Sequence, residues 1–183
     1  EVKTKNSGSV CIGAIIIAAF YITSVLKATA SGFLFRISDN SFNSALVLIQ
    51  TVGFVALWTT ANWAVATLLS GIGKLKEIFT VICYSIIPMV FGNIIYIIFS
   101  YMLNADEGEF LLIFVTAMQL YSVFMVIVGS IIIHDVSFGR FLAITLLTLI
   151  GIIIIIFLFV LIVIFFQQAA AFAATLWREI FFR

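Results

Sequence analysis

The chain has 183 residues, of which 64% are hydrophobic and 9% are charged, and its formal net charge is +1. A soluble domain typically contains about 45–50% apolar and about 25% charged residues, so this chain lacks the polar side chains that a surface in water requires. The small net charge and the scattered Lys and Arg residues also exclude the basic face of a nucleic-acid-binding protein.

Five apolar segments are long enough to cross the ~30 Å of hydrocarbon in a bilayer, which takes about 20 residues of helix. They are residues 9–27, 44–70, 79–103, 109–133 and 141–166. Strands of a β-barrel are excluded, because they alternate in polarity and are about ten residues long. The sequence therefore predicts an all-α, polytopic membrane protein with a five-helix transmembrane bundle in a single domain, residues 1–183.

The first apolar segment follows Lys3 and Lys5 and superficially resembles a signal peptide. It is longer than the apolar region of such a peptide and lacks a small-residue cleavage site, so we interpret it as an uncleaved first span. Cys11 in this span and Cys83 in the third have no CxxC or Cys/His spacing, which predicts two small core residues. With a cytoplasmic N-terminus, most Lys and Arg residues lie inside, and we predict this orientation.

Residues 167–183, QQAAAFAATLWREIFFR, are less apolar than the fifth span that precedes them. Their apolar side chains recur at helical spacing, beside Trp177 and Arg178. This pattern is typical of a short amphipathic helix that lies in the headgroup region. The alternative is a tail that extends the fifth helix.

The only proline of the chain, Pro88, lies inside the third span. Proline lacks an N–H and its ring clashes with the preceding turn, so it frees the carbonyl group of Tyr84 and predicts a bend near the bilayer centre. Within a membrane a freed carbonyl is satisfied again by a hydroxyl, a neighbouring helix or water. The nearest candidate donors are Ser85 and Asn93.

The fourth span places Thr116, Gln119 and Ser122 at a similar depth and at a spacing of three residues, which predicts one polar face. An unpaired amide in hydrocarbon is costly, so we expect Asn93 and Gln119 to face the interior of the bundle, where they could meet. One interpretation is purely structural, with hydrogen bonds that hold a kinked bundle together. The functional alternative is a polar notch for a substrate or a partner helix, formed by Tyr84, Ser85, Pro88, Asn93, Gln119 and Ser122.

The second span carries small residues at helical spacing. We define this small-residue stripe as Gly53, Ala56, Thr60 and Ala64. Small side chains allow the backbones of transmembrane helices to approach closely, so the stripe predicts a helix-packing surface.

Signatures of catalysis and ion coupling are missing from the sequence. The interiors of the second to fifth spans contain no ionisable residue, whereas ion-coupled carriers usually keep one there. No HExxH, GxSxG or P-loop motif occurs. His134, Asp135 and Ser137 lie too close together on one segment to form a catalytic triad. We predict no enzyme activity, no cofactor and no catalytic or metal site.

Two connections on the predicted cytoplasmic side carry polar residues. In the second of them, HDVSFGR, Asp135 or Ser137 is placed to cap the fifth span, and Arg140 to reach a lipid phosphate. A specific contact with a partner protein is the alternative. The candidate residues for a partner or headgroup contact are Lys74, Lys76, His134, Ser137 and Arg140.

The order of these features resembles the YIP family, the Ypt/Rab-interacting membrane proteins, and within it the bacterial branch. The resemblance rests on SGFLFR, on ANWAVATLLSGIGKLKEIFTVICYSIIPMVFGN, and on LNADEGEF, IIIHDVSFGR and QQAAAFAATLWREIFFR, and so covers nearly the whole chain. Tyr84 and Pro88 match the family's Tyr-x-x-x-Pro pattern. His134, Ser137 and Arg140 match its His-x-x-Ser-x-x-basic pattern.

The resemblance implies a five-span bundle with a cytoplasmic N-terminus. Eukaryotic members act in vesicle trafficking with Rab-type GTPases, but their Asp-Leu-Tyr-Gly-Pro motif is missing here, which argues against a GTPase partner. A bacterial plasma membrane fits better. We expect a non-enzymatic scaffold or adaptor that contacts the lipid bilayer and other membrane proteins, with a homo-oligomer left open. The alternative is a small transporter or an accessory subunit of a transport complex, with a path past Pro88, Asn93 and Gln119.

Overall fold

The computed structural model describes residues 9–35, 42–69 and 73–181, and all regular structure within these ranges is helical. The α-helices are α1 (Val10–Thr29), α2 (Ser44–Leu48), α3 (Phe54–Leu68), α4 (Leu75–Ser85), α5 (Ile87–Phe99), α6 (Gly108–His134) and α7 (Phe138–Phe181). A π-helical turn, η2 (Ile49–Gly53), joins α2 to α3, and a 3-10 turn, η3 (Ala105–Glu107), precedes α6.

The described helices form five segments that are long and apolar enough to span a membrane. The second segment comprises α2, η2 and α3, and the third comprises α4 and α5. The prediction of an all-α, five-span membrane protein is therefore confirmed. The third span begins at Leu75, earlier than the predicted residue 79, because the Glu77 carboxylate accepts a hydrogen bond of 3.0 Å from the Lys74 N–H. A carboxylate in the first turn satisfies a backbone donor that the helix leaves free.

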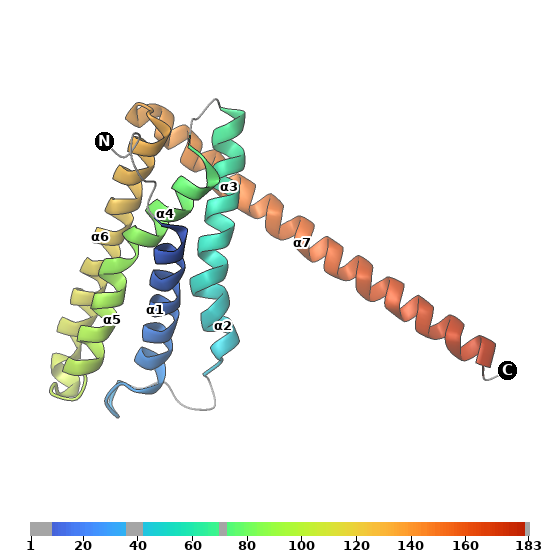
Figure 1. Cartoon of the computed structure of the whole chain (residues 1–183). Coiled ribbons are helices and arrows are strands. Elements are labelled where there is room, and N and C mark those ends of the chain that lie inside the picture. The colour runs from blue at the N-terminus through green and yellow to red at the C-terminus, as the bar shows by residue number, and fades with distance from the viewer. Residues whose placement is uncertain (1–8, 36–41, 70–72, 182–183) are drawn as a thin grey trace.

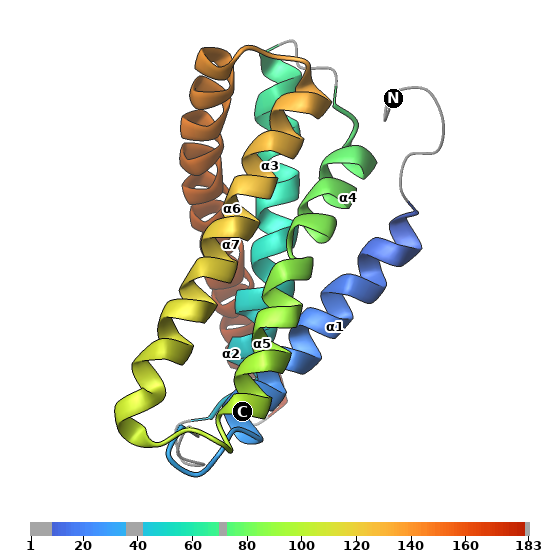
Figure 2. The same cartoon turned by 90° about the vertical axis from the view of Figure 1, so that its left-hand side faces the viewer.

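The five spans run up and down between two ends of the bundle (Figures 1 and 2). At the His134 end, α3 and α6 terminate and α4 and α7 begin. At the Lys27 end, α1 and α5 terminate and α2 and α6 begin. The short helix α4 is central, because it packs against α1, α3 and α6. The helix α5, which follows α4 in the third span, packs mainly against α1 and α6.

Close packing of α1, α3 and α4 forms the larger apolar core, which includes Ile17, Val55, Ile82 and Cys83. Gly13 permits the approach of α1 to α4, since a Cβ atom added there would lie 3.2 Å from the Cys83 Sγ. Cys83 is buried as predicted, whereas Cys11 is exposed and its prediction as a core residue is wrong. The face of α1 that carries Gly13 and Ile17 turns inward instead.

The C-terminal part of the chain differs from the prediction of a separate amphipathic helix. α7 continues through residues 167–181 as one helix of 44 residues, so the alternative of an extended fifth helix holds. The physical reason is the sequence where the fifth span meets residues 167–183. Gln and Ala favour helix there, and no Gly or Pro interrupts the chain after Gly151. At ~1.5 Å per residue, α7 is about 66 Å long, roughly twice the hydrocarbon thickness.

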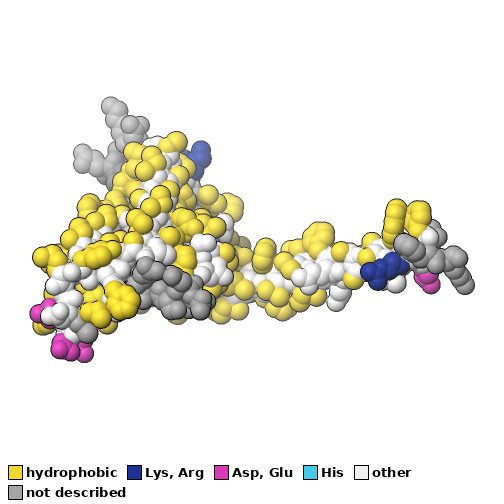
Figure 3. All heavy atoms as spheres, turned by 90° about the horizontal axis from the view of Figure 1, so that it is seen from below, with side chains coloured by type: hydrophobic (Ala, Val, Ile, Leu, Met, Phe, Trp, Pro, Cys, Tyr) yellow, Lys and Arg dark blue, Asp and Glu magenta, His cyan; other side chains and the backbone are white. Residues whose placement is uncertain are grey.

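The second half of α7 projects away from the bundle as a free rod (Figure 1). All its described side chains from Ile156 to Glu179 are exposed. Seen from the Lys27 end, apolar side chains cover both the bundle and this rod, and acidic side chains gather at one edge of the bundle (Figure 3). Of the residues that enter the predicted orientation, Lys3, Lys5, Arg36 and Arg183 lie outside the described residues.

Candidate functional site

Pro88 separates α4 from α5, as the sequence predicts. α4 ends at Ser85, α5 begins at Ile87, and Pro88 lies in the first turn of α5, where its missing N–H does least harm. Neither predicted donor serves the carbonyl group of Tyr84. The Ser85 hydroxyl donates to the Val81 carbonyl oxygen at 2.8 Å, and the hydrogen bonds of Asn93 go to α1. The Tyr84 side chain is exposed.

Asn93 is buried and connects α5 to α1. Its amide nitrogen Nδ2 lies 3.2 Å from the Ser24 Oγ and 3.5 Å from the Thr23 Oγ1. The prediction that Asn93 faces the interior is confirmed, but its partners lie on α1 rather than α6. Because these hydroxyls accept the amide protons, Asn93 sets the register of the two helices.

The predicted polar face of α6 does not form. Gln119 and Thr116 are exposed, whereas Ser122 is buried and its Oγ has no hydrogen-bond partner among the described residues. A step of three residues falls short of a full helical turn by about 60°, so residues 116 and 122 point in directions about 120° apart. Asn93 and Gln119 therefore do not meet, and the predicted notch is not assembled as one site.

The small-residue stripe lies on the outer face of α3. Ala56, Thr60 and Ala64 are exposed and Gly53 is half-buried, while Val55, Thr59 and Asn62 form the inner face. The Thr60 hydroxyl donates to the Ala56 carbonyl oxygen of its own helix at 2.9 Å, so it presents a methyl group and little polarity to the outside. The stripe therefore packs against none of the described helices along most of its length.

A groove lies between α3 and α7 at the end of the stripe that carries Ala64. The two helices cross where Gly151 meets α3, since a Cβ atom added to Gly151 would lie 3.8 Å from the Ala61 Cβ. Beyond the crossing α7 diverges from α3 (Figure 1). The cavity between them has a volume of about 450 Å³, and its walls include Ala64, Leu68, Leu147 and Ile154. Because Ala64 belongs to both features, the stripe leads into this α3–α7 groove.

The candidate contact residues of the two predicted cytoplasmic connections have separate surroundings. Lys74, Lys76 and Ser137 are exposed. The Ser137 carbonyl oxygen accepts the first hydrogen bond of α7, from the Phe141 N–H at 2.9 Å. Arg140 donates to the carbonyl oxygen of Leu69 at the end of α3. Arg140 thus closes an unsatisfied helix end and connects the start of α7 to α3.

His134 is buried rather than free for a partner, and it belongs to a polar chain that the sequence did not reveal. Thr148 donates to the Ile144 carbonyl oxygen, so its Oγ1 accepts from the Asn62 Nδ2 at 3.3 Å. The Asn62 Oδ1 then faces the His134 Nε2 at 2.9 Å, and the nitrogen must donate. This His134–Asn62–Thr148 chain joins α6, α3 and α7.

Only one signal could have revealed this chain. Asn62 and Thr148 lie in those halves of the second and fifth predicted spans that point to the side of the membrane where the fourth span ends at His134. The helix contacts that bring them together are long-range, since the partners are 72 and 86 positions apart in the sequence. Spacing along the sequence carries no information on such pairs.

A second polar feature that sequence reasoning missed lies at the Lys27 end. A lysine at a span end usually extends toward the water, but the Lys27 Nζ lies 4.6 Å from the centre of the Tyr96 ring, beside a cavity. No group of three or more His, Cys, Asp or Glu side chains among the described residues could hold a metal ion.

The chain was compared with models of known protein families. The model of the Yip1 domain matches residues 7–162, which include all five spans up to the free half of α7. The chain belongs to the Yip1 domain family. No curated protein and no solved structure matches it. The resemblance to the YIP family is thereby confirmed, and this Yip1 domain is an integral membrane protein with several spans.

Proposed function

We propose that this Yip1-domain protein is a non-enzymatic scaffold or adaptor that binds other membrane proteins. The observation that carries the proposal is the small-residue stripe on the outer face of α3, together with the α3–α7 groove into which it leads. A membrane helix with a row of small side chains on an outward face offers a surface that another helix can approach closely.

The occupant of this surface is a transmembrane helix of a partner protein. The groove is lined by apolar residues of α3 and α7 on both sides of the point where the two helices cross, so a third helix can pack against it from the bilayer side. Lipid tails are as apolar as the groove, and helix association in a membrane therefore depends on close van der Waals packing rather than on a hydrophobic driving force. Ala56, Thr60 and Ala64 permit such packing, because they protrude little.

A non-enzymatic role fits the use of the buried polar groups. Asn93 and the His134–Asn62–Thr148 chain bond to other helices of the bundle, and this cross-linking occupies groups that catalysis would need free. The Yip1 domain is itself known from non-enzymatic membrane proteins. We place the protein in a bacterial plasma membrane with a cytoplasmic N-terminus, which puts the His134 end in the cytoplasm.

Transport is the function with less support from the positions of the polar residues. Its predicted path ran past Pro88, Asn93 and Gln119, but Asn93 bonds to α1 and Gln119 is exposed on α6. The groups that would line a common path thus lie on different faces.

Two matched variants test the adaptor. Thr60 on the stripe and Thr116 on α6 are both exposed, and each hydroxyl donates to a carbonyl oxygen one turn back. Thr60→Leu adds bulk to the proposed contact, whereas Thr116→Leu makes the same change on another face. The measurement is quantitative co-purification of membrane proteins from native membranes in mild detergent. We expect Thr60→Leu to lose the partners that the wild type and Thr116→Leu retain.

If the wild type and both variants recover every partner equally, the stripe is not the surface that binds partner proteins. A partner that is lost only with Thr116→Leu would move the docking surface to α6. Thermal unfolding of each variant is measured in parallel, so that a loss of partner is attributed to the contact only when the bundle is intact.

A further inference from the structure

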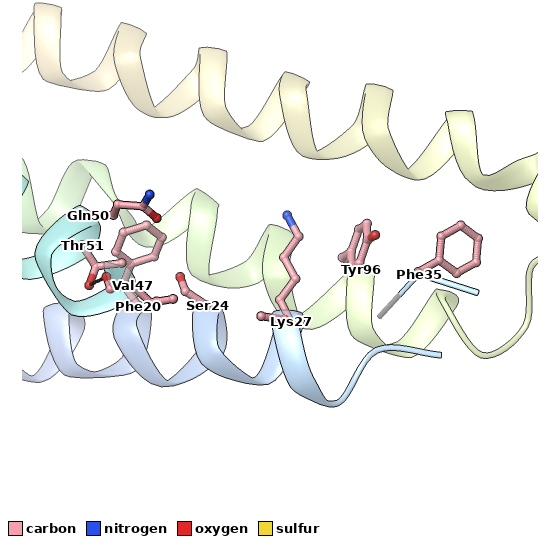
Figure 4. A pocket seen from close by; sticks show the side chains of 9 residues that line it. Phe20, Ser24, Lys27, Phe35, Val47, Gln50, Thr51 and Tyr96 are labelled. Carbon is pink, nitrogen blue, oxygen red and sulfur yellow. Dashed lines mark hydrogen bonds between the residues drawn. The ribbon is translucent and has the colours of Figure 1, made fainter. Parts of the chain in front are cut away.

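The cavity at the Lys27 end lies between α1, the α2–η2 segment and α5, and has a volume of about 340 Å³ (Figure 4). Ligand pockets in proteins begin at about 300 Å³, so this cavity holds a small group rather than a whole cofactor. Phe20 and Val47 give it apolar walls, and Ser24, Lys27, Gln50 and Tyr96 add polar ones.

Among the described residues that line the cavity, Lys27 carries the only charge. Its side chain is half-buried, and its ammonium group lies over the Tyr96 ring. Among the described residues no carboxylate forms an ion pair with it. The face of an aromatic ring attracts a cation but accepts no ordinary hydrogen bond, so three N–H donors of the ammonium remain for an anion.

Two further donors border the same cavity. The Ser24 Oγ accepts a hydrogen bond from the Asn93 amide, which leaves the Ser24 proton free to donate. Gln50 lies in the π-helical turn η2, and its side chain lines the cavity (Figure 4). Such turns insert one extra residue into a helix and occur frequently at functional sites. Here the turn brings Gln50 and Thr51 into the cavity wall.

We propose that this cavity binds the phosphate group of a phospholipid headgroup. Lys27 lies in the last turn of its span, which is the depth of the headgroups. The ammonium of Lys27 neutralises the phosphate, Ser24 and Gln50 donate hydrogen bonds to its oxygens, and Phe20 and Val47 contact the first carbons of the acyl chains. An ordinary lysine at a membrane surface extends into water, whereas this one is held between two helices.

The test uses the full chain in nanodiscs of phosphatidylcholine with a minor fraction of phosphatidylglycerol. Native mass spectrometry measures the phosphatidylglycerol that remains bound. Lys27→Gln should lower its apparent affinity about tenfold, the size expected for loss of a charge-assisted hydrogen bond. The control, Thr116→Val, changes an exposed side chain of α6 that does not line the cavity and should leave binding unchanged.

Ser24→Ala serves as a milder variant in case Lys27→Gln unfolds the bundle, and should weaken lipid binding a few-fold. A second arm adds inorganic phosphate to the detergent-solubilised protein. If inorganic phosphate binds in a manner that depends on Lys27 but no lipid is retained, the cavity is a site for free phosphate. That result would overturn the proposal that the phosphate belongs to a lipid. If neither lipid nor phosphate binding changes in Lys27→Gln and Ser24→Ala, the proposal is wrong.

Discussion

At the scale of single residues, three buried polar side chains of this Yip1 domain, Asn93, Asn62 and His134, form hydrogen bonds between helices. Asn93 bonds to Ser24 on α1, and Asn62 bonds to both His134 and Thr148. Hydrogen bonds of this kind in membranes contribute only about 0.6 kcal/mol on average. Their greater effect is on register, since a shifted helix would leave an amide unpaired in a medium without water.

The His134–Asn62–Thr148 chain predicts a coupled response to mutation. Asn62→Leu leaves the His134 Nε2 buried and unpaired, which should lower the free energy of unfolding by about 1–3 kcal/mol. His134→Leu likewise leaves the Asn62 Oδ1 without its hydrogen-bond donor. The double variant removes both groups, so its loss should be smaller than the sum of the single losses. Thermal unfolding in one detergent measures all three, and strictly additive losses would contradict the chain.

Among the described glycines, Gly32 lies at the position where an added side chain would clash most severely. A Cβ atom there would collide with the backbone carbonyl oxygen of Ser100, and the Gly32 N–H donates to the Ser100 Oγ at 2.8 Å. Gly32→Ala should therefore destabilise the protein by about 1–3 kcal/mol, as overpacking does. The matched control is Gly139→Ala, because a Cβ at Gly139 meets no atom within 4 Å. An equal melting temperature for both variants would contradict this contact.

At the scale of elements, the break at Pro88 divides the third span into two helices with different neighbours. Pro88→Ala restores the N–H that the Tyr84 carbonyl lacks and favours one straight helix. We expect insertion into the membrane to remain intact but the melting temperature to fall, because α4 and α5 can no longer both keep their packing. Ile98→Ala, a change at an exposed position of α5, serves as the control.

A topology reporter and a thermal melt together decide this prediction. A variant Pro88→Ala that inserts normally and melts with the wild type would show that the kink has no structural role. A variant that fails to insert would contradict the separation of insertion from packing.

The spans themselves were predictable because their length and apolarity follow from the thickness of the bilayer. The direction in which each side chain points, inward or outward, was less predictable. Spacing on one helix identified the stripe from Gly53 to Ala64 as a single face, but not that this face points outward. Gln119 was misplaced because a spacing of three residues drifts around the helix. The pairing of Asn62 with His134 depends on which spans become neighbours, which no local pattern encodes.

At the scale of the whole molecule, the protein is a bundle with a free rod. Removal of residues 167–183 should leave the melting temperature within error of the wild type, because the described side chains of this segment up to Glu179 are exposed and contact no other helix. Thermal unfolding of the shortened chain in detergent tests this. A clear loss of stability would mean that the segment packs against the bundle.

The most direct test of the adaptor is photo-crosslinking in the native membrane. A photoreactive phenylalanine replaces Trp63, which lies beside the small-residue stripe, or Phe124 on α6, and both of these aromatic side chains are exposed. Gel analysis after irradiation measures the adducts. We predict an adduct with another protein from position 63 and only lipid adducts from position 124. No protein adduct at position 63, or equal yields from both positions, would contradict the docking surface proposed here.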